Sequence, residues 1–126
     1  MTEDLLPTLR DRYPKLFSSE HLREIACYPG WLSLLDDLCL QLQTYLDTNP
    51  GVPQIVVLQV KEKFGGLRFY IAGGDQFCRV TVDTAEEASL KICEVCGQPG
   101  VLVGERWVSV RCDEHGAWVP PRDGDE

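Results

Sequence analysis

The chain has 126 residues, of which 44% are hydrophobic and 25% charged, and this composition is typical of a folded globular protein. Its formal net charge of −8 disfavours contact with the negatively charged backbone of nucleic acids. No apolar run approaches the roughly 20 residues that a membrane-spanning helix needs. The N-terminus has no basic segment followed by an apolar one, so it does not resemble a secretory signal. We therefore expect a cytoplasmic protein with no membrane partner.

Three helices are predicted in the first half of the chain. Residues 3–12 and 19–26 each fit a short helix that begins after a residue able to cap it. The clearest helix is at residues 31–47, where apolar residues recur at helical spacing and acidic and amide residues take the opposite face. The sequence Asn-Pro-Gly that follows is expected to end this helix.

Two strands are predicted next: residues 54–63, which are rich in valine and isoleucine, and residues 67–72, which return after a tight turn. Gly65 and Gly66 lie between them and favour a two-residue turn, since glycine accepts the positive φ angles of such turns. With this turn, alternation along the strands places one apolar set on the core face: Val56, Leu58, Val60, Phe64, Leu67, Phe69 and Ile71.

The other face of this hairpin carries a basic and aromatic set, Lys61, Lys63, Arg68 and Tyr70. A turn at the two glycines would pair Lys63 with Arg68 and Lys61 with Tyr70. The set could bind a phosphate or an acidic segment of a partner. The alternative is an ordinary solvated outer face, which is commoner in proteins.

Residues 77–92 fit two structures. The sequence Arg-Val-Thr-Val at 79–82 favours a strand by propensity, whereas the spacing of apolar residues from Phe77 to Ile92 favours a helix. The length of the segment and the acidic residues on its solvent face favour the helix.

Two matching loops in the last quarter of the chain predict a metal site. Cys93 and Cys96, and then Cys112 and His115, are spaced three apart, and a glycine follows each pair. Two ligands at this spacing converge on one ion when the chain turns sharply, and the four together fill a tetrahedral zinc shell. The alternative is three free cysteines and a surface histidine. A complete shell has no open position for water, so we expect one structural Zn²⁺ per chain and no catalytic metal.

The fifteen residues between the two loops read as a hairpin of two short strands, which is the plan of a zinc ribbon. The predicted fold is therefore α+β, with N-terminal helices packed on a β-hairpin, then a helix and a zinc-ribbon-like module. We predict a small body at residues 1–92, the module at 93–118 and a disordered tail at 119–126.

No catalytic motif is found. Cys27, Cys39 and Cys78 lack metal-ligand spacing, and Cys39 lies on the apolar face of helix 31–47. A Cys39 nucleophile with His21 as its base is conceivable, but nothing in the sequence orients the pair. We predict that the protein is not an enzyme and has no catalytic residues.

A further set of segments carries a family resemblance: Pro29-Gly30-Trp31, Leu38-Cys39, Gln59-Val-Lys-Glu-Lys-Phe-Gly-Gly-Leu-Arg-Phe-Tyr70, Gly73-Gly74-Asp75, Ala85-Glu86, Ser89 and Cys93-Glu-Val-Cys96-Gly. With them, residues 10–116 resemble a family of small phage and prophage proteins that are usually labelled hypothetical. The family has no assigned activity, so the resemblance implies provenance and not mechanism. It also favours the helix at 77–92.

These observations predict a non-enzymatic, zinc-stabilised interaction protein of phage or mobile-element origin. Its partner would be a host or phage protein, met in the host cytoplasm. Because acidic phage proteins can present a DNA-like surface, inhibition of host defence is a specific form of this hypothesis. The alternative is a nucleic-acid-binding or transcription-associated accessory protein that uses Lys61, Lys63 and Arg68. The sequence leaves the oligomeric state open.

Overall fold

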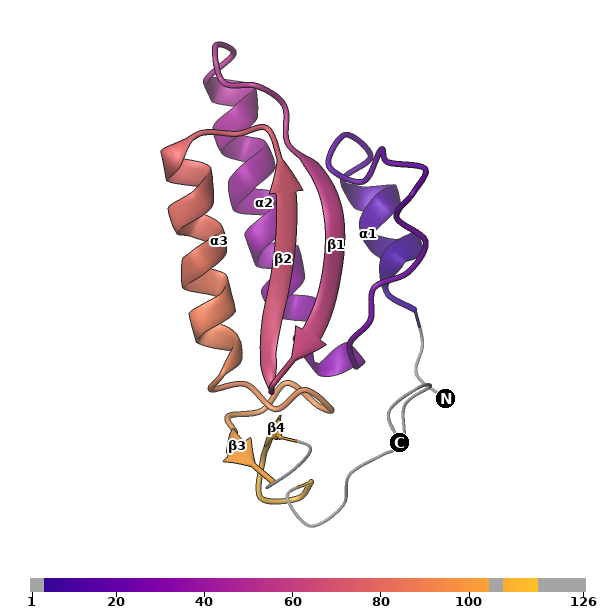
Figure 1. Cartoon of the computed structure of the whole chain (residues 1–126), viewed down its shortest axis with the longest axis vertical. Coiled ribbons are helices and arrows are strands. Elements are labelled where there is room, and N and C mark those ends of the chain that lie inside the picture. The colour runs from indigo at the N-terminus through magenta and orange to yellow at the C-terminus, as the bar shows by residue number, and fades with distance from the viewer. Residues whose placement is uncertain (1–3, 105–107, 116–126) are drawn as a thin grey trace.

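A computed structural model describes residues 4–104 and 108–115 of the chain. Its elements in order are α1 (Leu6–Arg12), the 3-10 turn η1 (Pro29–Trp31), α2 (Leu32–Thr48), β1 (Val56–Lys63), β2 (Gly66–Ala72), α3 (Gln76–Ser89), β3 (Val101–Val103) and β4 (Ser109–Arg111). The chain is therefore a mixture of helices and two small antiparallel sheets (Figure 1). The tail predicted to be disordered, residues 119–126, lies outside the described residues.

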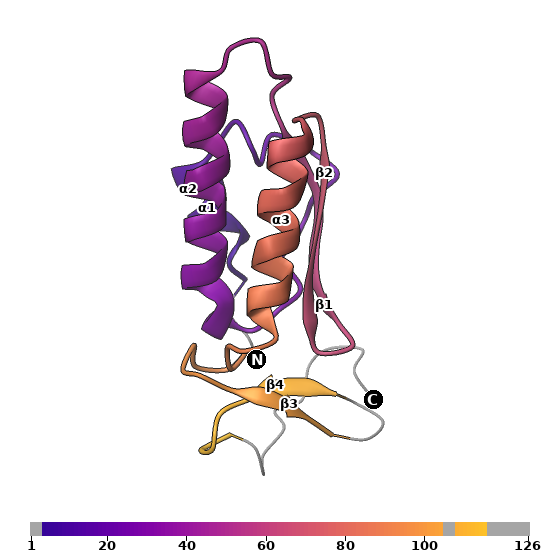
Figure 2. The ribbon, with the colours of Figure 1, turned by 90° about the vertical axis from the view of Figure 1, so that its left-hand side faces the viewer.

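The body is a layer of helices against one face of the β1–β2 hairpin. Figure 2 shows α2 and α3 side by side on one side of the hairpin, and no described element covers its other side. The core between the layers includes Trp31 and Leu35 from the helical side and Val60 and Phe69 from the strands. Within the described residues, α2 and the other helices are too short or too polar to cross a membrane.

The N-terminal part of the chain confirms two of its three predicted helices. Helix α1 occupies most of residues 3–12, and η1 followed by α2 occupies residues 29–48. The predicted helix at 19–26 is wrong. Ala26 instead forms a parallel bridge with Lys61, with its N–H donating to the carbonyl oxygen of Val60 at 3.0 Å. This bond is made to the edge of β1 that does not pair with β2. Because the two segments are distant in sequence, the local pattern does not reveal the contact, which outweighs the local preference for a helix.

The hairpin forms as predicted, but its turn lies one residue earlier in the chain. Phe64 and Gly65 are the turn residues, with φ of 54° and 86°. Lys63 therefore faces Gly66, and Lys61 faces Arg68, so the predicted pairs Lys63–Arg68 and Lys61–Tyr70 are wrong. Two positive φ angles define the type I′ geometry that matches strand twist, and the chain adopts it with a phenylalanine in the first position.

The predicted core face of the hairpin is correct near the turn and wrong at the start of β1. Val60, Leu67 and Phe69 are buried, whereas Leu58 and Phe64 are exposed and Val57 is fully buried. An irregularity of register between Val57 and Gln59 inserts one residue and reverses the alternation. Phe64 is exposed because it lies in the turn.

Helix α3 occupies Gln76–Ser89, so most of the segment predicted as a helix, 77–92, is helical, and the helix ends three residues earlier than predicted. The carboxylate of Asp75 caps the helix by accepting the N–H of Cys78 at 3.2 Å. Two α3 side chains then close the free edge of β2, because Ser89 Oγ accepts the N–H of Leu67 and Glu86 Oε2 accepts that of Phe69, both at 2.9 Å. These bonds fix α3 along the hairpin, and the chain leaves its C-terminal end directly into the first cysteine loop.

Candidate metal centre

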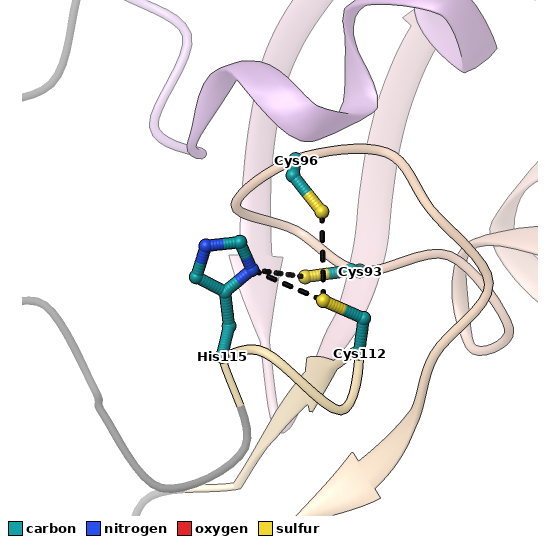
Figure 3. Close-up of side chains that lie close together, drawn as sticks. All are labelled: Cys93, Cys96, Cys112 and His115. Carbon is teal, nitrogen blue, oxygen red and sulfur yellow. Dashed lines mark hydrogen bonds between the residues drawn. The ribbon is translucent and has the colours of Figure 1, made fainter.

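The four residues predicted as metal ligands converge on one point. The ligand atoms of Cys93, Cys96, Cys112 and His115 all lie within 4.8 Å of one another. Figure 3 shows the three sulfur atoms and His115 Nδ1 pointing toward each other from two loops. All three cysteines are free thiols and form no disulfide. The cluster could therefore hold one metal ion.

The spacing of the ligand atoms matches a tetrahedral shell. Zn–S bonds of about 2.3 Å and a Zn–N bond of about 2.0 Å imply S···S separations of roughly 3.8 Å and S···N separations of roughly 3.5 Å. Cys96 Sγ and Cys112 Sγ are 3.6 Å apart, while His115 Nδ1 lies 3.7 Å from Cys93 Sγ and 3.1 Å from Cys112 Sγ. An ion would fit between these atoms with only small adjustments.

Each loop is closed by its own backbone. In the first loop, the N–H of Gly97 donates to the carbonyl oxygen of Cys93 at 2.9 Å, and Gly97 has a φ of 85°. In the second, the N–H of His115 donates to the carbonyl oxygen of Cys112 at 3.1 Å. Strands β3 and β4 pair in the interval between the loops, so the predicted short hairpin is present. The local turns and this short hairpin therefore bring the four ligands together.

Hydrogen bonds prepare Cys93 to bind a cation. Burial by itself raises the pKa of the Cys93 thiol, but backbone N–H groups, those of Cys96 and Cys112 among them, lower it to about 6. The pKa of Cys96 is raised: the N–H of Gln98 lowers it, while burial and the neighbouring Cys112 and Cys93 sulfurs outweigh that effect. The most buried sulfur is thus the one favoured as a thiolate, which is the form that binds metals.

The first loop is attached to the body through η1. The N–H of Gly30 donates to the carbonyl oxygen of Glu94 at 2.8 Å, and the indole N–H of Trp31 donates to the carbonyl oxygen of Ile92 at 3.0 Å. A Cβ on residue 30 would overlap the carbonyl oxygens of both Cys93 and Glu94. Only glycine therefore allows the backbone of η1 to approach the metal-binding loop this closely.

A buried ion pair links the two metal-binding segments. Glu94 and Arg111 both have fully buried side chains, with 3.6 Å between Glu94 Oε1 and Arg111 Nη1. Glu94 Oε2 also accepts the N–H of Tyr28 at 3.2 Å, and the Arg111 guanidinium lies 5.9 Å from the centre of the Tyr28 ring. Removing one partner of such a pair costs roughly 3–5 kcal/mol, because the other charge remains buried. The pair therefore fixes the position of the first loop relative to β4.

These two charged residues were not found from the sequence. A charged residue in a short polar loop is expected to face solvent, but the side chain of Glu94 has no exposure. The available signal was weak: Glu94 directly follows the first ligand, and Arg111, of opposite charge, directly precedes the third.

The basic and aromatic set of the hairpin lies on one face of its two strands and includes none of the candidate metal ligands. The register places Lys61 beside Arg68, with Lys63 and Tyr70 further along the same side of the two strands. Like charges directly opposite each other destabilise a strand pair. Whether this face binds a partner stays a prediction. Cys27, Cys39 and Cys78 are buried outside the cluster, and burial raises the pKa of Cys39 to about 12, which argues against a nucleophile there.

Comparison with known proteins adds no assignment, since no protein-family model, curated protein or solved structure matches this chain.

The contact at Gly30 leads to a direct prediction. Gly30→Ala should lower the stability of the metal-loaded protein by about 2 kcal/mol and weaken metal binding, because the new methyl group displaces the first loop. Gly51→Ala is the matched control, since a Cβ there meets no atom within 4 Å. Urea unfolding and competitive metal titration measure both effects. Equal behaviour of the two variants would contradict the proposed role of Gly30.

Proposed function

We propose that this chain is a zinc-stabilised interaction protein, in which one structural Zn²⁺ holds the C-terminal segment against the body. The observation that carries the proposal is the convergence of three sulfur atoms and one imidazole nitrogen within 4.8 Å on loops already closed by backbone hydrogen bonds. Zinc is the metal that suits a tetrahedral set of this kind.

The arrangement favours a structural ion over a catalytic one. Four protein ligands occupy all the positions of a tetrahedral shell, so no site is left for water or substrate. The side chain of Cys93 is fully buried, and the adjacent Glu94 is already engaged by Arg111 and by the N–H of Tyr28, so it is not placed to act as a general base. A metal of this kind supports the non-enzymatic role that we propose.

The partner and provenance belong to the same proposal. The resemblance to small phage and prophage proteins supports an origin in a mobile element, with action in the host cytoplasm on a host or phage protein. The net charge of −8 supports a specific form, in which the acidic chain competes with nucleic acid for a basic protein of host defence. The zinc-ribbon-like character of residues 93–118 is likewise supported by the paired strands β3 and β4 between the two loops.

A second function is favoured by one observation. Lys61 and Arg68 are cross-strand neighbours on the open face of the hairpin, a placement that would suit a phosphate group. A nucleic-acid-binding accessory protein would use this pair. An electrophoretic mobility shift with mixed DNA and RNA at low salt separates the two functions, because the interaction protein should give no shift.

The metal itself gives the first prediction of this proposal. Protein purified without chelators should carry about one equivalent of zinc per chain, and Cys96→Ser should lose most of it. Cys39→Ser is the control, since that cysteine is buried away from the cluster and its loss should leave zinc content unchanged. Elemental analysis checks both. Purified protein without zinc or another thiophilic metal would refute the structural-zinc proposal.

The interaction role predicts a metal-dependent partner. Immobilised zinc-loaded protein should retain a specific protein from a bacterial lysate at low salt, and the same column after chelation should not. A basic, nucleic-acid-binding partner would support the inhibitor form. Identical retention by the zinc-loaded and chelated columns would show that the partner does not depend on the metal-held structure.

A further inference from the structure

The turn of the β1–β2 hairpin meets the metal-held segment and the end of α3 at one place. Figures 1 and 2 both show the turn and the C-terminal end of α3 directed toward β3 and β4. A Cβ on Gly65 would overlap the Cδ1 atom of Leu102 in β3, and a Cβ on Gly66 would lie 3.3 Å from Leu90 Cδ2. Three segments that are distant in sequence thus form one composite surface.

This composite surface exposes large apolar side chains. Phe64 is 72% exposed, Leu102 50% and Leu90 42%. We call these three residues, together with Lys63, Arg68 and Lys91, the tip surface. Single exposed apolar residues are ordinary, but a cluster drawn from three elements is typical of an interaction site.

Phe64 is an unfavourable residue for the turn that it forms. Its φ of 54° is a left-handed conformation that asparagine and glycine adopt readily and a bulky aromatic residue does not. Its side chain is not compensated by burial, since most of it faces solvent. Backbone strain in an exposed aromatic residue suggests that the side chain serves binding and not folding.

The charges at the tip surface are opposite to that of the whole chain. The ammonium group of Lys63 lies 5.6 Å from the centre of the Phe64 ring, Lys91 directly follows Leu90, and an Nη1 of Arg68 lies close to Gly66. The acidic residue nearest in sequence, Glu62, is engaged by the N–H of Gly65 at 2.7 Å. A basic rim on an apolar patch, in a protein of net charge −8, favours an acidic ligand.

We propose that the tip surface binds an acidic segment of a partner protein, with apolar side chains that contact Phe64 and Leu102 and carboxylates that pair with Lys63 and Lys91. This inference rests on the proposed interaction function and names its surface and the chemistry of the partner. Because β3 supplies Leu102 and lies between the metal loops, the surface depends on the bound metal.

The test is a selection from a random 12-residue peptide library on the zinc-loaded full chain. Enriched peptides should combine Asp or Glu with large apolar residues, and their affinity should fall as salt is raised. Phe64→Asn should reduce the affinity about tenfold or more, as loss of a central aromatic contact does. The same variant should melt at an equal or higher temperature, since asparagine suits the turn.

Matched variants separate this surface from general effects. Leu40→Gln removes an apolar side chain from α2 whose exposure, 54%, is close to the 50% of Leu102 in the tip surface. Lys15→Glu makes the same charge change as the tip variant Lys63→Glu, but at an exposed position in the N-terminal segment. Only the tip variants should lose binding. Enriched peptides that are basic, no enrichment at all, equal binding by Phe64→Asn, or concentration-dependent dimers abolished by Phe64→Asn would each overturn the inference.

Failure of this inference can be distinguished from failure of the proposed function. A chain without zinc refutes the structural role of the cluster, whatever the peptides do. A chain that holds one zinc and binds peptides elsewhere keeps the proposed function and loses only the tip surface. The position of binding is read from backbone amide chemical shifts of residues 63–67, 90–91 and 101–103.

Discussion

The close backbone contact between Gly30 and the first cysteine loop is the constraint on which the rest of this structure depends. The N–H of Gly30 bonds to the carbonyl oxygen of Glu94, and the indole of Trp31 bonds to the carbonyl oxygen of Ile92. Trp31 is fully buried in the core of the body. The loop that carries two of the candidate metal ligands is therefore joined by two hydrogen bonds to the centre of the core, so a bound metal and the packing of the core would stabilise one another.

The same coupling explains how a structural metal could matter for binding. The ion would hold the first loop next to the second, the Glu94–Arg111 pair fixes the first loop against β4, and β4 pairs with β3. Leu102 of β3 lies against the hairpin turn at Gly65. A continuous set of contacts thus runs from the metal centre to an exposed apolar and basic surface, while the metal site itself has no place for a substrate.

Sequence reasoning succeeded where a local pattern determines the structure. The paired spacing of Cys93, Cys96, Cys112 and His115 identified the cluster, and helical periodicity identified α2 and α3. A metal-ligand spacing is informative because few backbone shapes satisfy it. The hairpin was also predicted from a local pattern, namely two strand-like segments separated by two glycines.

Features that depend on contacts between distant residues were missed. The segment at 19–26 is not helical because Ala26 bonds to β1, and the register of the hairpin is displaced because its turn uses Phe64 and Gly65. The burial of Glu94 depends on Arg111, which is far away in sequence. Nothing in the local sequence around these residues specifies their partners, so they could be found only from the three-dimensional structure.

Hydrogen exchange of the full chain, with zinc bound and after chelation, measures the coupling between metal centre and body most directly. The account predicts that chelation accelerates exchange of the backbone amides in residues 93–97 and 109–112 and also of the Gly30 amide and the Trp31 indole N–H, which lie outside the metal-binding segment. Faster exchange confined to residues 93–115, with Gly30 and Trp31 as protected as before, would contradict it.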